Sequence, residues 1–214
     1  MSQPAIKICG INAPAALDAA IAARADHVGF VFFARSPRNV TSPDAAALAE
    51  RNAGRVSAVG LFVDASDGKI ADAITAGRLD ILQLHGTESP DRAGELRARF
   101  GLPVWKAVPV AGSADVARAQ AYAGAADLVL FDAKAPAGAD LPGGMGLVFD
   151  WTLLAGLRIG LPWGLAGGLG PTNVADAVRL TGAPLVDVSS GVESAPGVKD
   201  AALIAAFCKA ARSA

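Results

Sequence analysis

Short apolar segments alternate with alanine-rich amphipathic segments along the whole chain. The apolar segments are dominated by Val, Ile, Leu and Phe, a composition typical of buried strands. Eight of them are predicted to be strands: Ala5–Cys9, His27–Phe32, Val56–Val63, Asp80–Leu84, Val104–Val108, Leu128–Phe131, Trp163–Ala166 and Leu185–Val188. The intervening segments are predicted to be helices: Ala13–Ala23, Pro43–Asn52, Asp67–Ala76, Pro90–Phe100, Ala114–Tyr122, Pro171–Leu180 and Lys199–Ala211, with Asp150–Gly156 as a weaker candidate.

Residues suited to helix starts precede several of these helices. Examples are Ser42-Pro43, Ser89-Pro90 and Gly170-Pro171, since a capping residue or a proline fits the first turn of a helix. Strands that alternate with helices pair in parallel through right-handed crossovers. The chain is therefore predicted to be an α/β protein, built as either a doubly wound sheet or a barrel.

The position of the glycine-rich turns decides between these two architectures. The first turn, Cys9-Gly10-Ile11-Asn12, lacks the glycine-rich phosphate loop that tends to follow the first strand of a doubly wound sheet. Such turns instead follow the last two strands, at Gly167-Gly168-Leu169-Gly170 and Ser189-Ser190-Gly191. Glycine lets backbone N–H groups approach a phosphate, and (β/α)8 barrels often bind phosphate after these strands. We therefore predict a single-domain (β/α)8 (TIM) barrel over residues 1–214.

One connection is longer than the others. The loop from Ala133 to Gly146 is rich in glycine and proline and cannot form regular structure. Long loops above the strand ends of a barrel usually serve as lids or binding loops, and occasionally as plain linkers. We expect a lid over residues 133–146.

Composition restricts the possible partners and the compartment. Hydrophobic residues make up 52% of the 214 residues and charged residues 18%, enough for a large core. The net charge of -1 gives no electrostatic reason to expect a nucleic-acid or membrane partner. Two cysteines, Cys9 and Cys208, form no disulfide framework, and neither a signal peptide nor a membrane-length apolar run is evident. A cytoplasmic protein is predicted.

Polar residues follow several of the predicted strands. They are Cys9 at the end of the first strand, Arg35 and Arg38 after the second, His85 after the fourth and Asp132 after the sixth. The carboxyl ends of barrel strands meet at one rim, where active sites lie. A thiol, an imidazole, an acid and arginines beside glycine-rich turns favour an enzyme.

Each of these residues also has a structural interpretation. Cys9 is either a small core residue or a nucleophile or base, and Asp132 either caps a turn or acts on a ligand. His85 either orients a loop or touches a substrate. Arg38 lies on a loop expected to be exposed, where a lone arginine is usually solvated.

Alternation along the first strand puts Ile6 and Ile8 on one face and Lys7 and Cys9 on the other. Asp187 points inward from the last strand, which is next to the first in a closed barrel. We therefore predict an internal ion pair between Lys7 and Asp187 rather than a catalytic lysine. Three further residues are predicted to be structural: Lys106, His27 and Cys208.

The sequence strongly resembles the phosphoribosylanthranilate isomerases of tryptophan biosynthesis. The resemblance covers nearly the whole chain and rests on the order and spacing of these motifs: Lys7-Ile8-Cys9-Gly10, Gly29-Phe30-Val31-Phe32, Ser36-Pro37-Arg38, Gln83-Leu84-His85-Gly86, Leu130-Phe131-Asp132, Phe149-Asp150-Trp151, Ala166-Gly167-Gly168-Leu169, Asp187-Val188-Ser189-Ser190-Gly191-Val192-Glu193, Pro196-Gly197 and Lys199-Asp200.

The resemblance implies a (β/α)8 barrel that isomerises a small phosphosugar without a metal or organic cofactor. It implies that Cys9 is the general base, Asp132 the general acid, and Arg38 the ligand of the anthranilate carboxylate. His85 is a further substrate-binding candidate. The phosphate is implied to be held by the backbone around Gly167, Gly168, Ser190 and Gly191.

The implied reaction, an Amadori rearrangement, needs an acid to open the furanose ring and a base to remove the C2 proton. An unperturbed thiol has a pKa of about 8.5 and a carboxyl about 3.9, so at neutral pH each mostly holds the wrong form. We expect cationic neighbours to favour the thiolate and burial beneath the lid to favour the neutral acid. A bell-shaped pH dependence of kcat/KM follows.

The chain departs from the family pattern in the expected lid. Met145, in Gly143-Gly144-Met145-Gly146, stands where the family usually has threonine or another small polar residue, and Leu147 where a basic or polar residue is frequent. Three effects of losing this hydroxyl are open: no change in function, an altered closure of the lid, or a slower enzyme. Because the acid, base and arginine candidates are all present, we expect activity to be retained.

Other functions fit the residues less well. A metal-dependent sugar-phosphate epimerase would need more histidines than His27 and His85, and the indole-forming synthase would need a catalytic lysine and glutamates at its strand ends. The remaining alternative is a catalytically silent barrel that binds a phosphorylated ligand or a partner protein. Monomer and homodimer both remain open.

Overall fold

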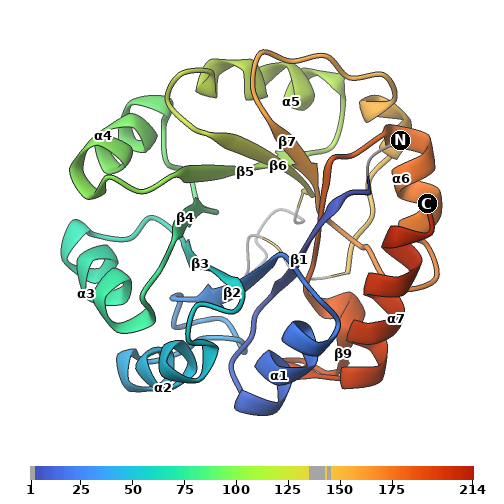
Figure 1. Ribbon diagram of the computed structural model, residues 1–214. Helices are drawn as coiled ribbons and strands as arrows, with labels where there is room; N and C mark the ends of the chain where they lie inside the picture. The colour runs from blue at the N-terminus through green and yellow to red at the C-terminus, as the bar shows by residue number, and fades with distance from the viewer. Residues whose placement is uncertain (1–2, 135–142, 144–145) are drawn as a thin grey trace.

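The computed structural model describes residues 3–134, 143 and 146–214. Its strands β1 to β8 form a closed parallel barrel, in which β8 pairs with β1. In Figure 1 the strands form an inner ring and the helices lie outside it. The strands are β1 (Ala5–Cys9), β2 (His27–Val31), β3 (Ser57–Phe62), β4 (Ile81–Leu84), β5 (Val104–Val110), β6 (Leu128–Ala133), β7 (Trp163–Leu165) and β8 (Leu185–Val188). The predicted (β/α)8 barrel is confirmed.

The helices follow the predicted order, with differences in three of them. They are α1 (Pro14–Ala22), α2 (Ser42–Asn52), α3 (Asp67–Gly77), α4 (Pro90–Phe100), α5 (Ser113–Arg118), α6 (Val174–Thr181) and α7 (Ala201–Arg212), with 3-10 turns η1 (Ala119–Tyr122), η2 (Trp151–Leu154) and η3 (Ser190–Val192). The predicted helix Ala114–Tyr122 divides into α5 and η1. The weaker candidate Asp150–Gly156 contains only η2, whose start is capped by the Asp150 side chain.

The prediction that Gly170-Pro171 starts a helix is wrong, because α6 begins at Val174. The Asn173 side chain accepts a hydrogen bond from Gly170 N at 2.8 Å and donates one to Gly168 O at 2.9 Å. These bonds fold the residues before the helix into a turn. The turn closes the glycine-rich loop that follows β7.

A short antiparallel hairpin, β9 (Glu193–Ala195) and β10 (Val198–Lys199), was not predicted. A Cβ at Gly197, where φ is +80°, would lie 2.5 Å from Pro37 O. Asn12 Nδ2 donates to Gly197 O at 3.0 Å. The hairpin is therefore packed against the loops after β1 and β2, at the end of the barrel where sites are expected.

The barrel interior is filled in layers. An apolar plug consists of Val59, Ile81, Trp105, Leu128, Leu130 and Leu185. Lys7 is fully buried beside it, with Nζ 3.0 and 2.9 Å from the two carboxylate oxygens of Asp187. The two residues are register partners in β1 and β8, so the predicted ion pair is confirmed. Cys9 lies in the next layer with Val31 and Leu61.

The three residues predicted to be structural are packed into the fold. Lys106 is buried, and its Nζ donates to Gly86 O at 2.8 Å. The His27 ring packs edge-on against Trp105, with 5.0 Å between ring centroids. Cys208 is buried in α7, and burial raises the pKa of its thiol to about 11.

Candidate active site

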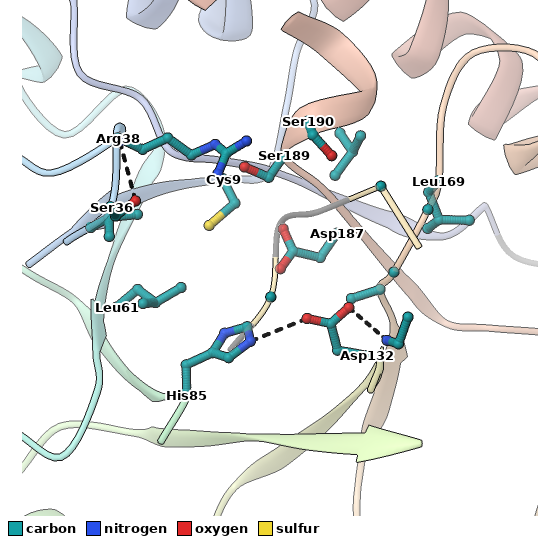
Figure 2. A pocket seen from close by; sticks show the side chains of 18 of the residues that line it. Cys9, Ser36, Arg38, Leu61, His85, Asp132, Leu169, Asp187, Ser189 and Ser190 are labelled. Atoms are coloured by element: carbon teal, nitrogen blue, oxygen red, sulfur yellow. Dashed lines mark hydrogen bonds and ion pairs between the residues drawn. The ribbon is translucent and has the colours of Figure 1, made fainter. Parts of the chain in front are cut away.

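A cavity of about 810 Å³, including its open mouth, lies at the carboxyl ends of the strands. Its lining contains most of the predicted site residues: Cys9, Arg38, His85, Asp132, Gly167, Gly168 and Ser190. They come from β1 and β6 and from the segments that follow β2, β4, β7 and β8 (Figure 2). Positions far apart in the sequence therefore meet at one place. The apolar part of the lining includes Phe33, Val63 and Leu61.

Cys9 is the last residue of β1 and is 5% exposed. A Cβ at Gly29, its register partner on β2, would lie 2.8 Å from Cys9 Sγ and 3.2 Å from Lys7 Nζ. Gly29 therefore leaves space for the thiol and the ammonium group. Burial raises the pKa of the Cys9 thiol; Lys7 lowers it and Asp187 raises it again. The expectation that cationic neighbours dominate is wrong here, because burial outweighs them.

Asp132 lies within β6, which runs one residue further, to Ala133. Asp132 Oδ1 accepts a hydrogen bond from Ala133 N at 2.8 Å, and Oδ2 lies 3.1 Å from His85 Nε2. A Cβ at Gly167 would lie 2.9 Å from Oδ1. The carboxyl is thus oriented by three neighbours and faces the cavity (Figure 2).

Arg38 is 5% exposed, so of its two interpretations the solvated loop arginine is wrong. Its Nε and Nη2 donate to Glu193 at 2.7 and 2.8 Å. Glu193 also accepts a hydrogen bond from Lys199 Nζ at 2.7 Å. Burial alone would raise the pKa of Glu193, but the hydrogen bonds from Arg38 and Lys199 outweigh it and lower that pKa. A buried carboxylate between two cations therefore fixes the guanidinium at the cavity wall.

Glu193 and Lys199 were given no role from the sequence. Lys199 Nζ also donates to Ser189 O at 2.9 Å, so the same cluster supports the loop after β8. The sequence signal was present, because both residues belong to motifs that carry the family resemblance. Their function is visible only once the β9–β10 hairpin places them behind Arg38.

The two glycine-rich loops meet closely. A Cβ at Gly191 would lie 1.9 Å from Leu169 O. Gly191 does not line the cavity but allows the loop after β8 to pack on the loop after β7. Gly167 and Gly168 have φ values of +83° and +64°, a conformation that glycine adopts without strain.

The expected lid lies mostly outside the described residues. Gly143, Gly146 and Leu147 are described and line the cavity. A Cβ at Gly143 would lie 2.7 Å from both Asp132 Oδ2 and His85 Nε2. Gly143 therefore lies against the acid candidate. Met145 lies outside the described residues.

Comparisons with known proteins agree with one another. Residues 6–210 match the family model described as N-(5'-phosphoribosyl)anthranilate (PRA) isomerase. The chain is 56% identical over 207 residues to an N-(5'-phosphoribosyl)anthranilate isomerase of Paramagnetospirillum magneticum, covering 97% of this chain and 96% of that one. The crystal structure of phosphoribosyl anthranilate isomerase from Thermotoga maritima is 34% identical, covers 99% of this chain and 100% of its own, and superposes with a TM-score of 0.87.

A further phosphoribosyl anthranilate isomerase structure contains reduced 1-(o-carboxyphenylamino)-1-deoxyribulose 5-phosphate. It is 33% identical, with a TM-score of 0.84 over 99% of this chain and 100% of that one. The fold and the site define a (β/α)8-barrel isomerase with a thiol and a carboxyl in one cavity. The chain belongs to the N-(5'-phosphoribosyl)anthranilate isomerase family.

Proposed function

We propose that the protein converts N-(5'-phosphoribosyl)anthranilate to 1-(2-carboxyphenylamino)-1-deoxyribulose 5-phosphate, as a step of tryptophan biosynthesis. The observation that best supports this proposal is that a thiol on β1 and a carboxyl on β6 lie on different sides of one cavity (Figure 2). The reaction is an Amadori rearrangement, which needs one acid and one base. NMR of the product should show a C2 ketone and a C1 methylene; an unchanged aminoaldose would exclude the proposed function.

The two candidate groups fit the order of the chemical steps. Asp132 is proposed to protonate the furanose ring oxygen, which opens the ring to an iminium. The Cys9 thiolate then removes the C2 proton, which the neighbouring iminium has made acidic, and the enolamine tautomerises to the ketone. An acid and a base on different sides of the sugar can act in succession without moving.

The remaining cavity residues suit the ends of this substrate. Arg38 is proposed to bind the anthranilate carboxylate, since a guanidinium forms strong paired hydrogen bonds with carboxylates. Phe33 and Val63 offer an apolar wall for the aromatic ring. His85 lines the cavity beside Asp132 and is proposed to contact the substrate there. The phosphate is proposed to lie against the backbone of the loops that contain Gly167, Gly168, Ser190 and Gly191.

The raised pKa of Cys9 sets the expected pH profile. The reactive form needs the thiolate together with a protonated acid, and the thiolate is scarce at neutral pH because burial raises the thiol pKa. kcat/KM should rise with pH, reach a plateau, and fall only when the thiolate is fully formed, at a pH above the ordinary titration range of a thiol. The kcat/KM profile of the wild type is therefore expected to be bell-shaped. A profile that is flat from acid to alkaline pH would contradict the acid–base pair.

A catalytically silent phosphate-binding barrel is the alternative function. It would keep the glycine-rich loops but would not need both an acid and a base at the cavity. Cys9 and Asp132 both line the cavity, which favours the enzyme. Binding of the phosphosugar by folded protein without turnover would favour the silent barrel instead.

The lid offers a test of the departure at Met145. Restoring the usual hydroxyl with Met145→Thr is expected to raise kcat/KM by up to ~10-fold if that hydroxyl bonds the substrate or the loop. Met145→Ala, which shortens the side chain without adding a hydroxyl, is the control. An equal kcat/KM for the wild type and Met145→Thr would show that the methionine is a neutral change.

Partners and compartment are also proposed. Within residues 3–134, 143 and 146–214, no helix is long and apolar enough to cross a membrane. A cytoplasmic location, a phosphosugar substrate as the main partner, the absence of nucleic-acid binding and a cofactor-free reaction remain predictions. So does the oligomeric state, for which monomer and homodimer are both retained.

A further inference from the structure

His85 makes a contact that substrate binding does not require. Its Nε2 lies 3.1 Å from Asp132 Oδ2, and the two side chains are 13% and 9% exposed. Ala133 N donates to Asp132 Oδ1, so Oδ2 is the carboxyl oxygen that faces the imidazole. Figure 2 shows the imidazole directed at the carboxyl across the cavity wall.

Gln83 lies on β4, two residues before His85, which directly follows the strand. It is 1% exposed, and its Nε2 is 3.2 Å from His85 Nδ1. Its Oε1 is buried and has no hydrogen-bond partner among the described residues. Rotating the amide by half a turn exchanges its nitrogen and oxygen, so Gln83 can either donate to a bare Nδ1 or accept from a protonated one.

We propose that Gln83, His85 and Asp132 form a proton relay that supplies the proton Asp132 delivers to the substrate. The relay rests on the proposed role of Asp132 as general acid. His85 holds the proton, and Gln83 is a positioning residue that accommodates both protonation states of Nδ1.

The proton count of the relay balances over a turnover. In the loaded state Gln83 Oε1 accepts Nδ1–H, and a second proton is shared between His85 Nε2 and Asp132 Oδ2. This shared proton passes to the ring oxygen and leaves a carboxylate beside a neutral imidazole that keeps its Nδ1 proton. One proton returns, directly or through water, when the enolamine loses its C2 hydroxyl proton on forming the ketone. The orientation in which Gln83 Nε2 lies 3.2 Å from Nδ1 suits a resting form outside this cycle, in which the neutral imidazole carries its proton on Nε2. Exchanging the amide nitrogen and oxygen gives the orientation of the loaded state.

Two features suit the pair to this task. An ordinary carboxyl is ionised at neutral pH, whereas an ordinary imidazole exchanges its proton near pH 6.5, so an adjoining imidazole supplies protons where a lone carboxyl cannot. The backbone at Gly143 covers the shared proton, because even a Cβ there would lie 2.7 Å from both Asp132 Oδ2 and His85 Nε2. Any larger residue at this position would separate the pair.

Other charged groups surround the pair but are common to every variant proposed below. Cys9, Asp187 and Arg38 line the same cavity. Behind His85, the neighbouring Gly86 is held by Glu88 and Lys106 and contacts Asp64. A difference in the pH profile of kcat/KM between the wild type and a variant at Gln83 or His85 therefore reports on the relay.

Nitrogen NMR of the histidine rings tests the relay without any variant of the site. The chain has two histidines, His27 and His85, so ¹⁵N-histidine labelling gives two ring systems, and His27→Gln assigns them. We expect the spectra to show two forms of the His85 ring at different pH values, an imidazole protonated at Nε2 and a form protonated at both nitrogens. A His85 ring that stays in one neutral form from pH 5 to 9 would overturn the relay.

The pH dependence of kcat/KM in Gln83→Met distinguishes a proton relay from a Gln83 that only holds His85 in place. Gln83 is not among the residues that line the cavity, and methionine has a similar shape but no amide. We expect the acidic limb of the kcat/KM profile to move about one to two pH units lower. The plateau of kcat/KM should fall ~10- to 100-fold. KM should change less than about twofold. His85→Gln, which cannot titrate, should shift the limb in the same direction.

The same change on the surface is the control. Gln120 is exposed on η1, and Gln120→Met should leave the profile unaltered. A lower plateau with an unmoved acidic limb in both Gln83→Met and His85→Gln would overturn the relay and leave Asp132 as general acid. Wild-type turnover in Asp132→Asn would instead remove the general acid, and the relay with it.

Discussion

Replacing Cys9 with alanine or Asp132 with asparagine is expected to lower kcat by ~10²- to 10⁴-fold, the contribution of a positioned general base or acid. Alanine cannot accept the C2 proton, and asparagine cannot donate a proton to the ring oxygen. Both side chains lie at the cavity wall and the substitutions remove few contacts, so the barrel should remain folded. Steady-state kinetics with freshly prepared phosphoribosylanthranilate measure the loss.

Matched substitutions elsewhere control for these variants. Cys208→Ala removes the other thiol, which is buried in α7 far along the chain, and Asp176→Asn removes an exposed carboxylate on α6. Both should keep kcat within about twofold of the wild type, because neither side chain lines the cavity. Near-normal turnover in Cys9→Ala or Asp132→Asn would show that a different group is the base or the acid.

Glu193→Gln is expected to destabilise the protein by about 3–5 kcal/mol, because it leaves Arg38 and Lys199 as buried cations without their shared carboxylate. The side chains of Glu193 and Lys199 are 4% and 0% exposed, so water cannot replace the lost charge. The KM for the substrate should also rise, because Glu193 fixes the Arg38 guanidinium. Urea unfolding measures the first effect and steady-state kinetics the second.

Glu95→Gln is the matched control for this substitution. Glu95 pairs with Arg92 at 3.5 Å on the surface of α4 and is 68% exposed, so its loss should cost at most about 1 kcal/mol. The pKa of Glu193 is lowered in the folded protein, so its stabilisation is present at neutral pH and is lost as the pH falls through that lowered pKa. Equal destabilisation by the two variants would contradict the role given to the buried cluster.

The architecture could be predicted because its signals are local. Each buried strand shows a short apolar run, and each connection shows helical spacing. Once a closed barrel was predicted, the contact between Lys7 and Asp187 followed, because alternation places both on inward faces of adjacent strands and an unpaired buried charge is too costly to persist. The structure places these two side chains in contact.

Features that depend on distant parts of the chain could not be predicted. The burial of Arg38 could not be predicted because its partner Glu193 is 155 positions away. The hairpin that carries Glu193 has strands too short to show a pattern. The pKa of the Cys9 thiol depends on the size of the effect of burial relative to the effects of Lys7 and Asp187. The sequence gives no measure of these effects. The Gln83 contact with His85 likewise needs side-chain positions.

The most direct test of the proposed isomerase is the decay of anthranilate-type fluorescence after wild-type protein is added to freshly made phosphoribosylanthranilate. Rapid loss of the signal, with an NMR spectrum of the ketone product and little decay in Cys9→Ala and Asp132→Asn, is the expected result. No decay above the uncatalysed rate with folded wild-type protein would contradict the isomerase function and favour a barrel that only binds its ligand.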